Sequence, residues 1–292
     1  MRISSMAQGL ALGLLFIAAP AVSRAQIGIG ISIRIGPPAL PVYVQPPCPL
    51  DGYLWTPGYW AYGPDGYYWV PGVWIAPPRP GLLWTPGYWG FGGGLYGWHA
   101  GYWGPHIGFY GGVNYGFGYT GVGFIGGAWQ GNVFRYNTAV VNVNTTVVRN
   151  VYVDRTVINN TTVVNRASFN GPGGVNAQPT PQQRSAMSEP HVQPTPTQMS
   201  HEQTASHDRG QLASVNHGRP AAAALEKPGG RQFGTGGTPR AGVQHANAMN
   251  SAPHNNAPPR EATHQERQQQ APHNSKPPAE HPHPEKEGHG KP

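Results

Sequence analysis

The chain has 292 residues, and its composition departs from that of an ordinary globular protein. Glycine and proline contribute 42 and 33 residues, about a quarter of the total, which is typical of chains with low-complexity segments. Only 11% of the residues are charged, and no lysine precedes Lys227, so the net charge of +7 does not form the dense basic patch that nucleic-acid binding requires.

The first 25 residues have the pattern of a secretory signal peptide. A short basic start is followed by an apolar run at residues 10–19 and by a small-residue cleavage site that ends at Ala25. The run is shorter than the ~20 residues that span a bilayer, and no later stretch is apolar enough to do so. We therefore predict cleavage after Ala25 and export to the periplasm, the outer membrane or the medium.

Residues 26–50 are predicted to form a short strand and a proline-rich linker. Isoleucine occupies the odd positions from Ile27 to Ile35, a period of two that favours a strand, and prolines then favour an extended chain over residues 37–50. The linker holds the single cysteine, Cys48, so no internal disulfide can form. Two interpretations of this cysteine stay open, a free thiol and an intermolecular disulfide.

Residues 51–104 repeat one motif, Trp-x-x-Gly-x-Trp, four times. The copies start 14, 15 and 14 residues apart, and regular repetition indicates one structural unit reused. Recurrent Pro-Gly disfavours helices, and the aromatic content favours short antiparallel strands in a meander. The eight motif tryptophans are Trp55, Trp60, Trp69, Trp74, Trp84, Trp89, Trp98 and Trp103.

Two kinds of turn are predicted within this block. The sequence Gly63-Pro64-Asp65-Gly66 is a typical hairpin turn that would join residues 58–62 to 67–71, and the loops at 77–81 and 92–94 would be equivalent. Pro-Gly inside the motif fits a type II turn, which would kink or offset the chain between strands rather than close a tight hairpin. The candidate turn-forming residues are Pro57, Gly58, Pro71, Gly72, Pro86 and Gly87.

The eight tryptophans have two candidate roles. They can be the core of a thin sheet that has few aliphatic residues, because aromatic side chains bury a large area and stabilise cross-strand pairs. Alternatively, exposed ring faces can stack against a ligand such as envelope polysaccharide or peptidoglycan, or hold a quaternary ammonium group. The core role is favoured for most of them.

Residues 105–170 are predicted to extend the β structure. Val113, Tyr115, Phe117 and Tyr119 alternate with small or polar residues, and the alternation changes phase near residues 120–121, which indicates a turn or bulge. The Asn/Val-rich residues 138–166 are predicted to form half-buried strands, with an edge open to self-association.

Residues 171–292 are predicted to be a disordered tail. Pro, Gln, His, Asn, Ser and Ala dominate there, and large apolar residues are too few to offset the entropy of ordering. A transient helical turn is expected near Ala221–Leu225. Most of the histidines lie in this tail, but nothing in the sequence fixes the geometry of a metal site.

The stretches YLWTPGYW and YYWVPGVW resemble the bacterial YXWGXW (WXXGXW) repeat-containing proteins. The glycine-aromatic run after the repeats, the segment ending VVNRASFNGPGG and the phrase ASVNHGRP look like the longer members of that family, so the resemblance covers most of residues 50–220. Leu82 in place of the leading Tyr and Ala100 in place of the motif Pro are departures. The resemblance implies an exported envelope protein and supplies no catalytic residue.

The sequence contains no pattern that indicates catalysis. The acids of the region predicted to fold are Asp51, Asp65 and Asp154, and His99 and His106 lie in a glycine-rich stretch without a matching nucleophile or metal-ligand motif. We therefore expect a non-enzymatic structural or interaction protein of the cell envelope, without a cofactor or metal. The alternative is a carbohydrate- or peptidoglycan-binding module that uses exposed Trp and Tyr faces.

Overall fold

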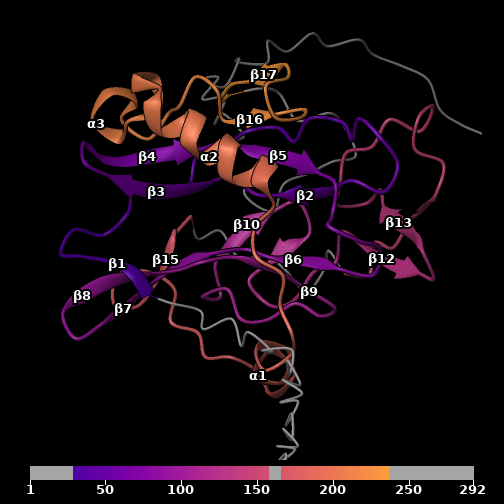
Figure 1. Ribbon diagram of the computed structural model, residues 1–292, viewed down its shortest axis with the longest axis horizontal. Helices are drawn as coiled ribbons and strands as arrows, with labels where there is room; N and C mark the ends of the chain where they lie inside the picture. The colour runs from indigo at the N-terminus through magenta and orange to yellow at the C-terminus, as the bar shows by residue number, and fades with distance from the viewer. Residues whose placement is uncertain (1–28, 158–165, 237–292) are drawn as a thin grey trace, which may run out of the picture. The chain divides into compact units, whose positions relative to one another are not determined.

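The computed structural model describes residues 29–157 and 166–236, which belong to one compact unit (Figure 1). Strands and short hairpins dominate these residues, so the predicted mainly β class is confirmed. The predicted signal peptide lies outside the described residues. The predicted N-terminal strand is present as β1 (Ile29–Ile33).

The first two repeats form one long antiparallel hairpin. One arm consists of β2 (Leu54–Thr56) and β3 (Tyr59–Gly63), and the other of β4 (Gly66–Val70) and β5 (Gly72–Ile75). β2 pairs with β5 and β3 pairs with β4. The Pro-Gly pairs interrupt this ladder without changing its register, because Thr56 faces Val73 and, three residues further along each arm, Tyr59 faces Val70.

The third and fourth repeats form a second hairpin of the same design. Its arms are β6 (Leu83–Thr85) with β7 (Tyr88–Gly92), and β8 (Leu95–His99) with β9 (Tyr102–Gly104). Thr85 faces Tyr102 and Tyr88 faces His99, so the register is again continuous across the interruption. The repeats are therefore paired in twos, and residues 76–82 connect the two hairpins.

The turns at the two hairpin tips follow from their residues. Pro64 and Asp65 close the first hairpin, and Gly66 adopts the left-handed φ of 98° that only glycine tolerates easily, which confirms the predicted turn. Gly93 and Gly94 close the second hairpin with φ values of 59° and 81°. Two successive positive values define a type I′ turn, whose twist matches that of the flanking strands.

The two hairpins pack against each other as layers. Figure 1 shows β3 and β4 over β7 and β8. The indole nitrogen of Trp89 donates to the carbonyl of Trp60 (2.8 Å), and the rings of Tyr59 and Trp98 stack with centroids 5.1 Å apart. The second hairpin is widened into a four-stranded sheet in the order β1-β8-β7-β15, where β15 is Phe169–Asn170.

The glycine-aromatic segment folds against both hairpins. It forms the hairpin β10 (Asn114–Gly116) and β11 (Tyr119–Thr120), and then β12 (Gly127–Gln130) and β13 (Val133–Asn137). The predicted apolar face at positions 113, 115, 117 and 119 is buried. The hydroxyl of Tyr119 lies 3.1 Å from the carbonyl of Trp55 and 3.0 Å from that of Trp84, so one side chain bridges the two hairpins.

The predicted strands in the Asn/Val-rich segment are mostly absent. Over residues 138–157 only β14 (Val151–Tyr152) is a strand, and it pairs in parallel with β13. Asparagine and aspartate side chains compete with strand pairing here by binding nearby backbone. Asn144 accepts from the amide of Thr146, and Asp154 accepts from the amide of Thr156. Residues 158–165 lie outside the described residues.

The proline-rich segment 37–50 is extended, as predicted, but it packs into the core rather than linking separate parts. Leu40, Tyr43 and Cys48 are each at most 5% exposed. The carbonyls of Ala39 and Pro46 accept hydrogen bonds from buried tryptophans of the first hairpin. The prolines favour an extended backbone, and its carbonyls are therefore free to accept these bonds.

The prediction of disorder is wrong for residues 171–236. They form α1 (Pro181–Met187), α2 (Pro196–His207), the 3-10 turn η1 (Arg209–Gln211), α3 (Ala213–Asn216), β16 (Ala224–Leu225) and β17 (Gln232–Phe233). The expected helical turn near Ala221–Leu225 is instead the strand β16, which pairs in parallel with β5. No helix in the described ranges has the length and apolar character of a membrane span. Residues 237–292 of the predicted tail lie outside the described residues.

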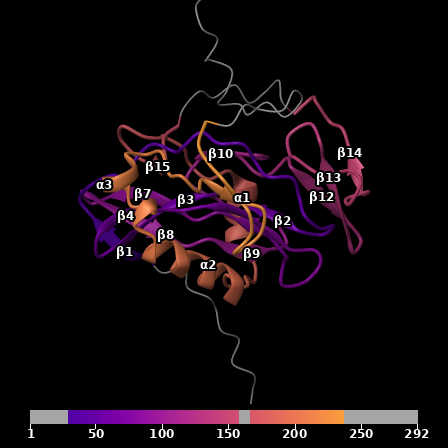
Figure 2. The same cartoon turned by 90° about the horizontal axis from the view of Figure 1, so that it is seen from above.

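Short polar and small side chains explain how this segment folds without large apolar residues. Thr180 and Gln183 form a capping box at α1, Thr195 and Gln198 form one at α2, and a proline occupies the first helical position of each. Figures 1 and 2 show α2 lying across the first hairpin. Ala205 of α2 is buried there in a small cluster with Ala61, Tyr68, Val70 and, partly buried, Leu212.

We expect Gly72→Ala to destabilise the fold. A Cβ at this position would lie 2.5 Å from Trp55 Cζ2, and overpacking of a rigid core typically costs about 1–3 kcal/mol. Gly92→Ala is the matched control, because a Cβ there meets no atom within 4 Å and Gly92 does not adopt a positive φ. Urea unfolding followed by tryptophan fluorescence measures both variants, and equal midpoints would contradict the role assigned to Gly72.

Candidate functional site

The eight motif tryptophans form four cross-strand pairs. Partners face each other across the ladder, and their ring centroids lie 5.2–5.4 Å apart in tilted or edge-to-face arrangements. This geometry is the favoured one for aromatic pairs, which contribute roughly 0.5–1.5 kcal/mol each beyond their area burial. The pairs are Trp55 with Trp74, Trp60 with Trp69, Trp84 with Trp103, and Trp89 with Trp98.

The spacing inside the motif follows from these pairs. The first Trp of each copy faces the second Trp of the partner copy. The residue two positions before that second Trp is therefore a diagonal neighbour of the first Trp. That residue is the motif glycine. A Cβ on Gly87 would lie 2.5 Å from Trp98 Cζ2, and a Cβ on Gly101 would lie 2.5 Å from Trp84 Cζ2. The glycine therefore provides the space in which the ring of the partner copy lies.

This contact corrects the prediction that the Pro-Gly pairs form type II turns. Gly58, Gly72 and Gly87 do not have the positive φ that such a turn requires, and the chain passes through each Pro-Gly without reversing. Glycine is needed there for its missing side chain, since an indole ring lies against it. The prolines Pro57, Pro71 and Pro86 interrupt the ladder because they have no amide hydrogen to donate.

The interruption makes backbone amides available to other segments. The amide of Gly58 donates to the hydroxyl of Tyr43 (3.3 Å), and the amide of Gly72 donates to the carbonyl of Ala223 (3.2 Å). The linker segment and β16 thus bind the first hairpin at the same level. Burial raises the pKa of the Tyr43 phenol well above its ordinary value, so this hydroxyl stays protonated.

The structure places seven of the eight tryptophans in the interior. Trp98 is the half-buried exception, and each of the others is at most 7% exposed. Several of their ring nitrogens are bound, for example Trp69 to the carbonyl of Ala223 and Trp74 to that of Pro46, both at 2.9 Å, whereas Trp55 Nε1 is buried without a partner in the described residues. Stacking of a ligand on these rings would require the hairpins to separate.

Comparison with known families identifies the repeat of the first hairpin. The family model described as "WXXGXW repeat (2 copies)" matches residues 51–74. Residues 51–74 are two WXXGXW repeats. The matched segment is almost the whole first hairpin, so the two matched WXXGXW copies are the two arms that pair with each other. The chain matches no curated protein and no solved structure.

The titratable residues singled out in the sequence are not brought together. Asp65 lies in a hairpin tip, Asp51 binds Asn150, and His106 lies 2.8 Å from Glu189 on the surface. Burial lowers the pKa of His99, whose ring stacks on Tyr88 with centroids 4.5 Å apart. In the described ranges, no three His, Cys, Asp or Glu residues are grouped so that they could hold a metal ion.

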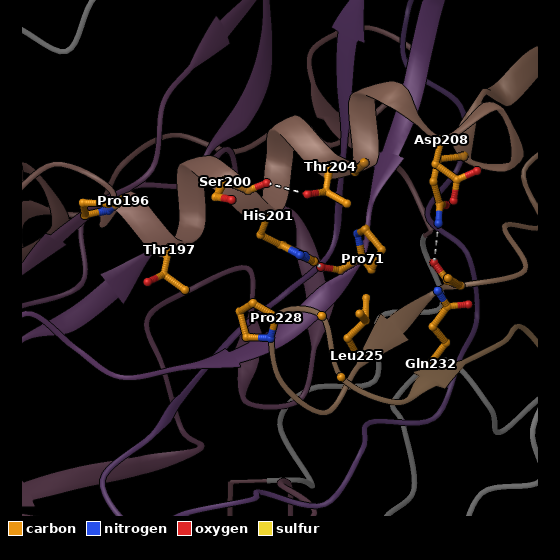
Figure 3. A pocket seen from close by; sticks show the side chains of 15 residues that line it. Pro71, Pro196, Thr197, Ser200, His201, Thr204, Asp208, Leu225, Pro228 and Gln232 are labelled. Carbon is orange, nitrogen blue, oxygen red and sulfur yellow. Dashed lines mark hydrogen bonds between the residues drawn. The ribbon is translucent and has the colours of Figure 1, made fainter.

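A second candidate site, which sequence reasoning missed, is a groove between α2 and the β16–β17 hairpin (Figure 3). Its volume is about 610 Å³, within the range of ~300–1,000 Å³ that is usual for small-molecule sites. Thr197, Ser200, Thr204 and Asp208 line it from the side of α2, and Leu225, Pro228 and Gln232 line the other side. The sequence signal that could have revealed α2 is the capping pattern Thr-Pro-x-Gln, which occurs at the start of both α1 and α2.

His201 connects this groove to the first hairpin. Its Nε2 lies 2.8 Å from the carbonyl of Pro71, and because a carbonyl only accepts, Nε2 carries the proton. Burial lowers the pKa of the imidazole, an effect that the hydrogen bond to Pro71 partly opposes. The side chain is therefore held neutral, with Nδ1 left as an acceptor.

We predict that Cys48 is unreactive in the folded protein. Its thiol is 1% exposed, and burial raises its pKa from 9.0 to about 12, which reduces the reactive thiolate about a thousandfold at pH 8. A chromogenic disulfide reagent should label the thiol only after unfolding in urea. The chain has one cysteine, so the signal belongs to this residue alone. Rapid labelling of the native protein would contradict the prediction and show a thiol accessible enough to form an intermolecular disulfide.

We also predict that the fold loses stability as the pH falls below about 6.5. The pKa of His201 is lower in the folded chain than its ordinary value of 6.5, so its contribution is complete above that value and is lost as the pH falls through the folded pKa. His201→Gln keeps a neutral donor and should make the stability–pH slope between pH 7.5 and 5 less steep. His207→Gln is the control, because His207 is exposed. Equal slopes in the two variants would contradict the prediction.

Proposed function

We propose that this chain is an exported, non-enzymatic structural or interaction protein of the bacterial cell envelope. The observation that supports it best is that the repeat tryptophans form cross-strand pairs in the core. Seven of the eight rings are buried. Residues of this kind build a rigid scaffold. The N-terminal signal pattern supports export, and the family match to the WXXGXW repeat over residues 51–74 supports a repeat-based architecture.

The partner of this scaffold is proposed to be another envelope component or a second copy of the chain. The alternative function, polysaccharide or peptidoglycan binding by exposed Trp and Tyr faces, depends on open ring faces. Among the eight tryptophans the described structure offers only Trp98, which is partly covered by Tyr59. No observation favours this second function over the scaffold role, so it is not proposed for the tryptophans.

Export and processing test the proposal directly. We expect the full chain, expressed in a bacterium with two membranes, to be recovered from the periplasm, outer membrane or medium with Gln26 as its first residue. Ala25→Arg places a large charged residue at the cleavage site and should leave the longer, unprocessed form. Mass spectrometry of each fraction reads both results. Recovery of a cytoplasmic chain that still begins at Met1 would contradict the proposal.

A further inference from the structure

The groove between α2 and the β16–β17 hairpin contains a buried acceptor without a partner. Gln211, on η1, is 3% exposed, and its Nε2 donates to the carbonyl of Ala222 (3.2 Å). That bond fixes the orientation of the amide, so Oε1 is the acceptor that is left. Six buried side-chain polar atoms lack a partner in the described residues, and Gln211 Oε1 is the only one of them that belongs to a residue lining this groove.

A buried acceptor of this kind costs about 1–3 kcal/mol unless a donor reaches it. Gln211 is one of the residues that line the groove, so the groove is the side from which such a donor can come. Gln211 is bound to Ala222, another residue of the groove lining, whereas Ser200 and Thr204, which line the groove from α2, are exposed (Figure 3). The donor can therefore come from a ligand as well as from water.

The other groups of the groove define the ligand chemistry. Nδ1 of His201 is an acceptor, one carboxylate oxygen of Asp208 binds Gly210 and leaves the other available, and Ser200 and Thr197 present hydroxyls that donate and accept. No Lys or Arg lines the groove, so an anionic ligand would find no counter-charge there. The complementary ligand has several hydroxyl groups and no negative charge.

Peptides fit this surface less well than sugars. Proline-rich peptides bind in grooves lined by aromatic rings, and amphipathic helices bind in broad apolar grooves. This groove has neither, because its apolar residues are prolines, alanines and a single leucine. The small apolar side chains together with the hydroxyl, amide and carboxylate groups of the lining instead match the mixture of C–H and O–H groups of a saccharide.

We infer that the groove between α2 and the β16–β17 hairpin is a binding site for a neutral oligosaccharide, in which Gln211 Oε1 accepts a hydrogen bond from a sugar hydroxyl. The site is separate from the tryptophan pairs and uses none of their ring faces. It is also independent of the export proposal, since binding is measured with purified protein and export is measured by cell fractionation.

Titration of the purified full chain tests this site. The probes are the neutral trisaccharides maltotriose, cellotriose and tri-N-acetylchitotriose, each to about 10 mM, with an alanine- and proline-rich decapeptide as the peptide arm. Calorimetry and ¹H–¹⁵N spectra are recorded for each probe. We expect at least one trisaccharide to bind with a Kd of about 1 mM or below and to shift the amide signals of Ser200, Thr204 and Gln211.

Three variants locate the binding. Thr204→Tyr fills the groove from an exposed position and should weaken binding by at least about tenfold. Gln203→Tyr makes the same change at an exposed neighbour on α2 that does not line the groove, and it should bind within about twofold of the unaltered chain. Gln211→Met removes the acceptor at similar volume and should weaken binding about fivefold, the effect of one hydrogen bond. Tryptophan fluorescence confirms that each variant is folded.

Each of three other outcomes would overturn the inference. The first is that no trisaccharide binds, which would leave water as the partner of Gln211. The second is that the decapeptide binds with the same dependence on Thr204 and the sugars do not. The third is that a sugar binds Thr204→Tyr and Gln211→Met as tightly as the unaltered chain, which would place it elsewhere.

Discussion

The contact on which the rest of the structure depends is that of an indole ring lying over a glycine of the opposite strand. Trp55 lies against Gly72 in this way, and Trp84 lies against Gly101. Each contact fixes the lateral position of one arm relative to the other, because moving the strands by two residues would place a side chain where the ring must lie. A two-stranded hairpin is marginally stable on its own. Here the rings provide much of the core, and the second hairpin, the linker segment and the tyrosine at position 119 are held by the carbonyls and amides around them.

The Pro-Gly interruption lies at the same position as this contact, because the glycine under the ring belongs to a Pro-Gly pair in every copy but the fourth. A continuous ladder would pair the backbone groups of the two arms with each other and leave little for other segments to bind. The interrupted ladder exposes the amides of Gly58 and Gly72, which are bound by Tyr43 from the N-terminal side and by Ala223 from the C-terminal side. Segments that are more than 150 residues apart in the chain thus meet at one point of the first hairpin. The same arrangement gives α2 its position, since His201 binds the carbonyl of Pro71 in the interruption itself.

Sequence patterns predicted the features that depend on neighbouring residues in the chain. The strand at residues 29–33, the turn at Pro64-Asp65 and the core role of most motif tryptophans could be read from alternation, turn residues and repetition. The pairing of copies in twos could not, because spacings of 14 and 15 residues suit a meander as well as two separate hairpins. The C-terminal helices were missed because α2 has no apolar stripe. It is held by caps, by Ala205, by a hydrogen bond that Gln198 accepts from Trp103 and by one that His201 donates to Pro71, both partners being distant in the chain. The groove was missed with it, since its walls exist only after that docking.

Pairing within hairpins has a consequence for how such chains can lengthen or shorten. One copy alone has no opposite glycine for its first ring and no opposite ring for its own glycine, so a gain or loss of a single copy would leave an unmatched arm. The unit that can be duplicated without this defect is a pair of copies with its connecting loop, which repeats here from Trp55 to Trp84. Chains of this architecture are therefore expected to have an even number of copies. Recombination between the first arms of two hairpins, or between their second arms, keeps the number even.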